Sequence, residues 1–242
     1  MLDNLRQAPR SRSSGGRSAC ASELGRDCQD GAVLDTPGVV GALTARQLDL
    51  LRGMAELDPP PFVFGGYAED ALLAGTVTRP HLDVDWLVPR SELELRLAQA
   101  RTLGFTEFET WGESAPGEPF YLFAKQGDLS IDIGISDESC GQINGRIWKL
   151  AFEIDGRPAP AGYQFELPWD TYNHPAVRLD GIAMRVISPL ALYQLRAAIA
   201  TKGSFGPLSE RQQASLLKLR ETFFPDAGDD ELAPRTRPLP AA

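Results

Sequence analysis

The sequence predicts an α/β (α+β) fold, in which a mixed sheet is flanked by helices and followed by a small C-terminal helical region. Two observations predict the sheet. The apolar stretches 62-FVF-64 and 82-LDVDWLV-88 are preceded by prolines, and 129-LSIDIGI-135 alternates apolar and polar residues as a half-exposed strand does. A third observation predicts the helices, because apolar residues recur at helical spacing between these stretches and again after residue 188.

The first half of the chain combines strands with helices. A capping box at Thr44 and Gln47 predicts the start of one helix, and Ser91 with Glu94 predicts the start of another. The predicted elements are, in order, a helix at 44–57, a strand at 62–64, a helix at 67–74, a strand at 82–88, a helix at 92–103, and strands at 106–110, 121–125 and 129–135.

The second half of the chain is less regular. Residues 156–177 are rich in Pro and Gly and predict mainly loops. Ser188 before Pro189 predicts a helix that runs to about residue 200, and Ser209 with Gln212 predicts a final helix. The predicted organisation is a flexible leader at 1–40, an α/β domain at 41–155, a loop and helical region at 156–225 and a loose tail at 226–242.

Charge and cysteine content exclude several classes of function. Lys and Arg number 24 against 33 Asp and Glu, a net charge of -9. No nucleic acid and no membrane is therefore expected as a partner, whereas a cationic small molecule is. The three cysteines have no metal-binding spacing, and no apolar run is long enough for a secretory signal or a membrane span. We therefore expect a cytoplasmic protein.

Three carboxylates carry the strongest chemical signal. Asp83 and Asp85 project from the same face of their predicted strand, roughly 6 to 7 Å apart. Asp132 lies on the polar face of a later strand, and pairing would bring it beside the first two. Asp128 shares that polar face and is the alternative third acid, although the regular alternation favours Asp132. Such a set suits Mg²⁺, which binds carboxylates together with substrate phosphates.

Two glycines give the carboxylates a context. Gly65 and Gly66 lie between a strand and a helix, where the backbone can approach a phosphate chain and the helix N-terminus attracts anions. Arg79 can add a fork-shaped phosphate donor. Two divalent ions beside a bound triphosphate stabilise the attacking and leaving oxygens of a phosphoryl or nucleotidyl transfer. The sequence therefore predicts nucleotidyl transfer.

The segment GGYAEDALLAGTVTRPHLDVDWLV resembles the catalytic core of the aminoglycoside and lincosamide nucleotidyltransferases, in the DNA polymerase β-like nucleotidyltransferase superfamily. The resemblance covers about residues 62–135, and VRLDGIAMRVISPLALYQLR matches a later strand and helix of the family in order and spacing. The chain departs from the family pattern at Tyr67, where Trp is usual, and at Glu69, where an apolar residue is usual.

The resemblance implies a role for each matching residue. Gly65 and Gly66, with Tyr67 and Arg79, would bind the nucleotide. The metal ligands would be Asp83, Asp85 and Asp132, with Asp132 completing the site or acting as the general base. The resemblance makes 41–155 the catalytic domain.

The expected activity is Mg²⁺-dependent transfer of a nucleoside monophosphate, with AMP from ATP as the first choice, to a hydroxyl of a small cationic acceptor. Two Mg²⁺ ions and ATP or another nucleoside triphosphate are the expected cofactor and co-substrate. An aminoglycoside is the leading acceptor, which implies antibiotic resistance. The alternatives are a toxin-like nucleotidyltransferase that modifies RNA or protein, and a catalytically silent nucleotide-binding module. The sequence leaves the acceptor, the nucleotide and the oligomeric state open.

Overall fold

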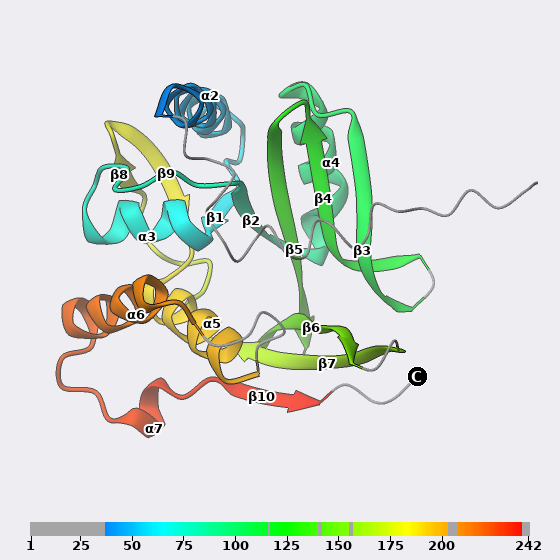
Figure 1. Cartoon of the computed structure of the whole chain (residues 1–242), viewed down its shortest axis with the longest axis vertical. Coiled ribbons are helices and arrows are strands. Elements are labelled where there is room, and N and C mark those ends of the chain that lie inside the picture. The colour runs from blue at the N-terminus through cyan, green and yellow to red at the C-terminus, as the bar shows by residue number, and fades with distance from the viewer. Residues whose placement is uncertain (1–36, 116, 140–141, 155–156, 203–207, 239–242) are drawn as a thin grey trace, which may run out of the picture. The chain divides into compact units, whose positions relative to one another are not determined.

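The fold is built around one mixed sheet with helices packed against it (Figure 1). This computed structural model describes residues 37–115, 117–139, 142–154, 157–202 and 208–238, and ten strands are found in that part of the chain. All of the described residues belong to one compact unit, Thr36–Ala242. The architecture confirms the predicted mixed α/β class.

The helices and strands of the first half lie close to their predicted positions. They are, in chain order, α2 (Pro37–Ala55), β1 (Phe62–Phe64), α3 (Gly65–Leu73), β2 (Val84–Pro89), the short 3-10 helix η1 (Arg90–Glu92), α4 (Leu93–Thr102), β3 (Glu107–Ala115), β4 (Glu118–Gln126) and β5 (Leu129–Ser139). Those of the second half are β6 (Gln142–Ile154), β7 (Arg157–Leu167), β8 (Val177–Leu179), β9 (Ile182–Val186), α5 (Pro189–Lys202), α6 (Glu210–Phe223), α7 (Asp229–Leu232) and β10 (Arg235–Pro238).

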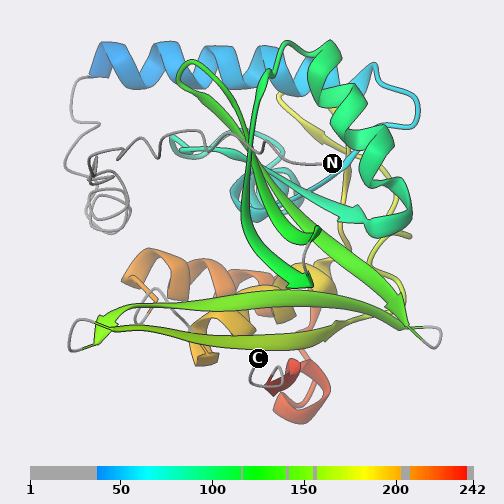
Figure 2. The same cartoon turned by 90° about the vertical axis from the view of Figure 1, so that its right-hand side faces the viewer.

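Strand β5 connects the parts of the sheet. The order of the strands is β10-β7-β6-β5-β2-β1-β9-β8, and β4 also pairs with β5 and carries β3 on its other side. Strand β2 runs parallel to β5, whereas β4 and β6 run antiparallel to it. Figure 2 shows the β6–β7 hairpin crossing one end of the β3–β5 strands and lying beside α5.

The apolar side chains of β2 and β5 face the hydrophobic core. Val84 and Trp86 of β2 and Ile131 and Ile133 of β5 are fully buried. Helix α2 packs on this core, where the Trp86 indole N–H donates to the sulfur of Met54 at 3.4 Å. Since side chains alternate along a strand, the residues between these apolar positions face the opposite side of the sheet. That side carries the site described below.

Two of the predicted helix starts are wrong and two are confirmed. Helix α2 begins at Pro37, so Thr44 and Gln47 lie inside it and form no cap. The chain enters α4 through η1 without a side-chain cap, so Ser91 and Glu94 form no capping box. Ser188 Oγ does accept the backbone N–H of Ala191, and Ser209 forms the predicted capping box with Gln212. The predicted leader boundary at residue 40 falls inside α2.

The prediction of loops at 156–177 is wrong for its first part. Strand β7 pairs with β6 as a long hairpin, and the prolines that argued against a strand lie at an edge. Pro160 is opposite Leu150 of β6, while among the described residues β10 pairs with β7 only from Tyr163 to Glu166. A proline is tolerated at an unpaired strand edge because its missing N–H breaks no ladder there. The predicted loose tail from residue 226 is also wrong, since it contains α7 and β10.

No described helix combines the length and the apolar character that crossing a membrane requires.

The packing of β5 predicts a large effect for a core truncation. Ile131→Ala removes a side chain that is 0% exposed and leaves a cavity beside Val84, so the free energy of unfolding should fall by about 2–5 kcal/mol in urea titration. Leu217→Ala, in a side chain of α6 that is 55% exposed, is the control and should change it by less than about 0.5 kcal/mol. Equal losses in the two variants would contradict the packing.

Candidate active site

The structure brings the predicted carboxylates to one face of the sheet. Parallel pairing of β2 with β5 places Asp85 directly opposite Asp132, and Asp83 immediately precedes β2. All three side chains are partly exposed, whereas Val84 and Ile131 beside them are buried. The alternation in the sequence therefore predicts correctly which residues meet.

Asp128 does not share this position. It precedes β5, it is exposed, and it forms an ion pair with Arg46 of α2. Of the two acids that the sequence left as alternatives, Asp132 is the one opposite Asp85.

Burial and mutual repulsion make the three carboxylates reluctant to ionise. Burial raises the pKa of Asp85 well above its ordinary value, and the charges of Asp83 and Asp132 raise it further. Burial is also the main cause that raises the pKa of Asp83. Burial followed by the charge of Asp83 raises the pKa of Asp132 from 3.8 to about 8. Without a bound cation, the ionised forms of these three side chains are therefore unfavourable.

Tyr121 of β4 supports Asp132 from the neighbouring strand. Its hydroxyl donates to Asp132 Oδ2 at 3.2 Å, and this hydrogen bond partly offsets the rise in the pKa of Asp132. The same environment raises the pKa of Tyr121, first by burial and then by the charge of Asp132. Sequence reasoning missed Tyr121, because only the pairing of β4 with β5 brings it to this carboxylate.

The two glycines are required by side chains of the site itself. Gly65 has φ +67°, and a Cβ there would lie 1.8 Å from Asp85 Oδ2. A Cβ on Gly66 would lie 2.2 Å from His81 Nδ1. The backbone N–H of Gly66 also donates to the Asp85 carboxylate and holds its pKa down. The glycines thus let a carboxylate and an imidazole approach the N-terminus of α3, and their contact with phosphate stays a prediction.

His81 links the helix to Arg79. Its Nδ1 lies 3.0 Å from Arg79 Nη1 and its Nε2 lies 2.8 Å from Asp70 Oδ2. Because a guanidinium can only donate, Nδ1 is the acceptor, and Nε2 carries the proton that is donated to Asp70. Asp70 also accepts from the backbone and the hydroxyl of Thr78. Asp70 therefore fastens the loop before β2 to α3.

Tyr67 has a supporting position in the structure, and its predicted role in nucleotide binding stays a prediction. It is 1% exposed, and its hydroxyl donates to Gln47 Oε1 at 2.7 Å. Its ring lies against the His81 ring at 4.2 Å between centroids. Gln47 Nε2 donates in turn to the His81 carbonyl at 3.1 Å. The sequence pattern predicts that Gln47 caps a helix, and so it does not predict this link between α2 and the site.

Arg196 is a second residue that sequence reasoning missed. It comes from α5, and its Nη2 donates to Glu69 Oε2 of α3 at 2.7 Å. Its positive charge lowers the pKa of both Asp83 and Asp85. Arg196 therefore lies near the carboxylate face in space, although it is more than a hundred positions away from Asp83 and Asp85 along the chain.

The donor set fits a divalent cation in its chemistry, but no metal site is preformed. Among the described residues, no three His, Cys, Asp or Glu side chains form a group that could already hold a metal ion. The aspartates supply the oxygen ligands that Mg²⁺ prefers, and no described Lys or Arg forms an ion pair with them. Metal binding by Asp83, Asp85 and Asp132 thus stays a prediction, and it requires these side chains to turn toward one another.

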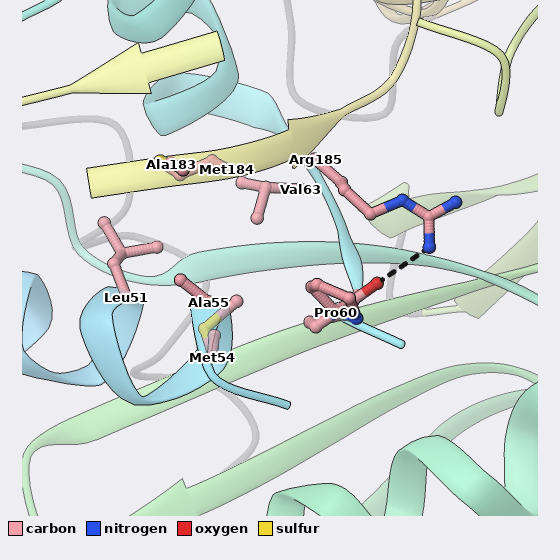
Figure 3. Close-up of a pocket in the computed structure, with 9 residues that line it drawn as sticks. Leu51, Met54, Ala55, Pro60, Val63, Ala183, Met184 and Arg185 are labelled. Carbon is pink, nitrogen blue, oxygen red and sulfur yellow. Dashed lines mark hydrogen bonds between the residues drawn. The ribbon is translucent and has the colours of Figure 1, made fainter. Parts of the chain in front are cut away.

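A small pocket lies elsewhere, between α2, β1 and β9 (Figure 3). Leu51, Met54, Val63 and Met184 contribute apolar walls, and Arg185 donates to the Pro60 carbonyl at 3.2 Å. None of the predicted site residues lines it.

Comparison with solved structures shows that the chain has the nucleotidyltransferase fold. It is similar to the crystal structure of ANT(2″)-Ia in complex with adenylyl-2″-tobramycin, with a TM-score of 0.53 and 21% identity over 77% of this chain and 92% of that one. It is likewise similar to the solution structure of the antibiotic-resistance factor ANT(2″)-Ia, with a TM-score of 0.53 and 20% identity over 78% and 88% of the two chains. No family model and no curated protein matches the chain. The predicted resemblance is confirmed at the level of the fold.

The close approach of Asp85 to Gly65 predicts that a side chain at this position destabilises the fold more than one at another glycine with a positive φ. Gly65→Ala adds a Cβ both at a positive φ and against Asp85, whereas Gly127→Ala adds one at a similar φ of +62° with open space around it. The positive φ alone costs about 1–2 kcal/mol in either variant. We expect Gly65→Ala to lower the free energy of unfolding by roughly 1 kcal/mol or more beyond Gly127→Ala. Equal costs in thermal unfolding would contradict the close approach.

The raised pKa of Asp132 predicts that Asp132→Asn stabilises the metal-free protein by an amount that depends on pH. Between its ordinary value of 3.8 and its folded value of about 8, the folded state binds the proton that the unfolded state has lost. The contribution of Asp132 to stability is therefore fully present below pH 4 and is lost as the pH rises toward 8. The stability of Asp132→Asn relative to the native chain should rise over this range in urea titrations with EDTA. A constant difference would refute the raised pKa.

Proposed function

We propose that this protein is a Mg²⁺-dependent nucleotidyltransferase, which moves a nucleoside monophosphate from a nucleoside triphosphate to a hydroxyl of a small cationic acceptor. One observation carries the proposal: three carboxylates share a sheet face beside a Gly-Gly helix start, in a chain with the nucleotidyltransferase fold. ATP is the first choice of donor and two Mg²⁺ ions the expected cofactor. We place the reaction in the cytoplasm.

The proposed reaction is an in-line displacement. The acceptor hydroxyl oxygen attacks the α-phosphorus, the bond from this phosphorus to the oxygen that bridges to the β-phosphate breaks, and pyrophosphate leaves. The hydroxyl proton passes to Asp132, which lies opposite Asp85 on the carboxylate face and which bound divalent cations would keep ionised. Tyr121 holds Oδ2 of that carboxylate in place. Divalent cations held by Asp83 and Asp85 would neutralise the charge that develops on the phosphate oxygens.

The triphosphate would lie at the N-terminus of α3. Backbone N–H groups at a helix start attract anions, and the two glycines place no side chain of their own at that start. The Arg79 guanidinium lies beside Gly66, 3.0 Å from where its Cβ would be. It is held there by His81, so it is ready to donate to a phosphate oxygen.

The acceptor is proposed from charge. The chain has a net charge of -9 and its carboxylate face is short of cations, so an amine-rich molecule is favoured over a polyanion such as RNA. An aminoglycoside fits this description, and one of the similar structures is a complex with adenylyl-2″-tobramycin. Such an activity would confer resistance to the antibiotic that is modified.

Transfer of label from ATP tests the proposal. Purified protein is incubated with Mg²⁺, α-labelled ATP or GTP, and a panel of aminoglycosides, nucleosides and RNA. We expect labelled aminoglycoside and free pyrophosphate. We further expect Asp83→Asn and Asp85→Asn each to lower kcat at least about 100-fold, because they remove charge that the transition state needs.

Asp128→Asn is the matched control, because Asp128 is an exposed acid that directly precedes β5, the strand of Asp132, but lies outside the site. It should leave kcat within about twofold. If no acceptor is labelled, or if Asp128→Asn impairs the reaction as much as Asp85→Asn, the proposed function is wrong. Label on RNA alone would favour the toxin-like alternative.

A further inference from the structure

Two arginines from separate segments share one oxygen of a buried glutamate, and a third arginine is near enough to act on one of them. Glu69 of α3 is 4% exposed, and its Oε2 accepts from Arg196 of α5 at 2.7 Å. Arg79 Nη2, from the loop before β2, lies 3.8 Å from the same oxygen. Arg211 of α6 is near enough for its charge to lower the pKa of Arg79, an effect second only to burial. Helix α3 packs on both α5 and α6, which brings these residues together (Figure 1).

Positive charge is concentrated in this cluster. Arg196 and Arg79 share one carboxylate oxygen of Glu69, in a chain whose net charge is -9. Burial, and then the charges of Arg211 and Arg196, lower the pKa of Arg79, while the charges of Glu69 and Asp70 act in the opposite direction. Like charges brought together at a partly buried place are costly unless an opposite charge joins them. The cluster is therefore suited to a bound anion with more than one negative charge.

The cluster lies beside the proposed triphosphate position. A Cβ on Gly66 would be 3.0 Å from Arg79 Nη2, so this guanidinium covers the start of α3. The charges of Arg79 and Arg196 both lower the pKa of Asp83. The anion site and the carboxylate face are therefore neighbours, as the two ends of a Mg²⁺-bound polyphosphate require.

Glu69 is not arranged as a residue that only stabilises the fold. One oxygen, Oε2, serves Arg196 and Arg79, while Oε1 is buried and has no hydrogen-bond partner. A buried carboxylate oxygen without a partner destabilises the folded state. The evident effect of Glu69 is to hold two guanidinium groups at one point.

We propose that Glu69 is a positioning residue, which holds Arg196 and Arg79 so that both guanidinium groups bind the leaving pyrophosphate of the nucleotide. This inference rests on the proposed function. Arg196, whose side chain is 15% exposed, and Arg79 then contact the phosphates, while Glu69 acts through them. Bidentate arginine contacts to phosphate oxygens are strong and directional, so their orientation matters more than their charge alone.

Binding of inorganic pyrophosphate in the presence of Mg²⁺, measured by isothermal titration calorimetry, tests the proposal. We expect Arg196→Gln and Glu69→Gln each to weaken the binding of pyrophosphate about tenfold or more, since contacts between charged groups are lost. In steady-state assays Glu69→Gln should raise the KM for ATP by a similar factor and change kcat by less than about threefold. Glu92→Gln is the matched control, because Glu92 pairs with Arg96 outside the site. It should change neither the affinity for pyrophosphate nor the KM for ATP.

A double variant separates positioning from a general structural role. If Glu69 acts through the arginines, Glu69→Gln should have a smaller effect in the Arg196→Gln background than in the native chain, because only Arg79 is then left for it to hold. The double variant also removes both members of the Glu69–Arg196 ion pair, so it remains measurable if a single variant unfolds. Multiplying effects in the double variant, or a Glu69→Gln protein with a lower melting temperature but native pyrophosphate affinity and KM, would overturn the proposal.

The proposed function and this inference can fail separately. Label transfer by the native chain together with unchanged pyrophosphate affinity in Glu69→Gln and Arg196→Gln overturns only the role of Glu69. Absence of both label transfer and pyrophosphate binding in the native chain overturns both.

Discussion

Repulsion among carboxylates on one face of β2 and β5 is the constraint on which the rest of the site depends. The parallel register fixes Asp85 opposite Asp132, and the buried apolar residues on the other face of these strands hold that register. A one-residue slip would place acids in the core and apolar side chains in the site. The hydrophobic core therefore supplies the free energy that keeps like charges together until a cation joins them.

The segments around this face reduce the repulsion without removing it. The N-terminus of α3 donates a backbone N–H to Asp85, which requires Gly65 and Gly66 to lie against the strand. Tyr121 donates to Asp132 from the other side. The hydrogen bond from Tyr121 only partly offsets the burial and the neighbouring charge of Asp83, which together raise the pKa of Asp132 to about 8. A divalent cation with a bound polyphosphate would supply the missing charge and the anion for the neighbouring arginines.

Local patterns in the sequence predicted the carboxylate face correctly, because strand alternation decides which side chains share a face. Alternation favoured Asp132 over Asp128, and the structure places Asp132 in the site. Long-range contacts could not be predicted in this way. Tyr121 reaches the site only through pairing of β4 with β5, and Arg196 only through packing of α5 on α3. Gln47 was interpreted as a cap, since its partners His81 and Tyr67 lie far along the chain.

The most direct test of the account is the binding of Mn²⁺, a paramagnetic substitute for Mg²⁺, measured by EPR with and without ATP. The account predicts that the native chain binds Mn²⁺, that ATP strengthens this binding, and that Asp83→Asn and Asp85→Asn lose it. If the native chain binds no Mn²⁺ with ATP present, or if both variants bind it as the native chain does, the carboxylate face is not a metal site and the account is contradicted.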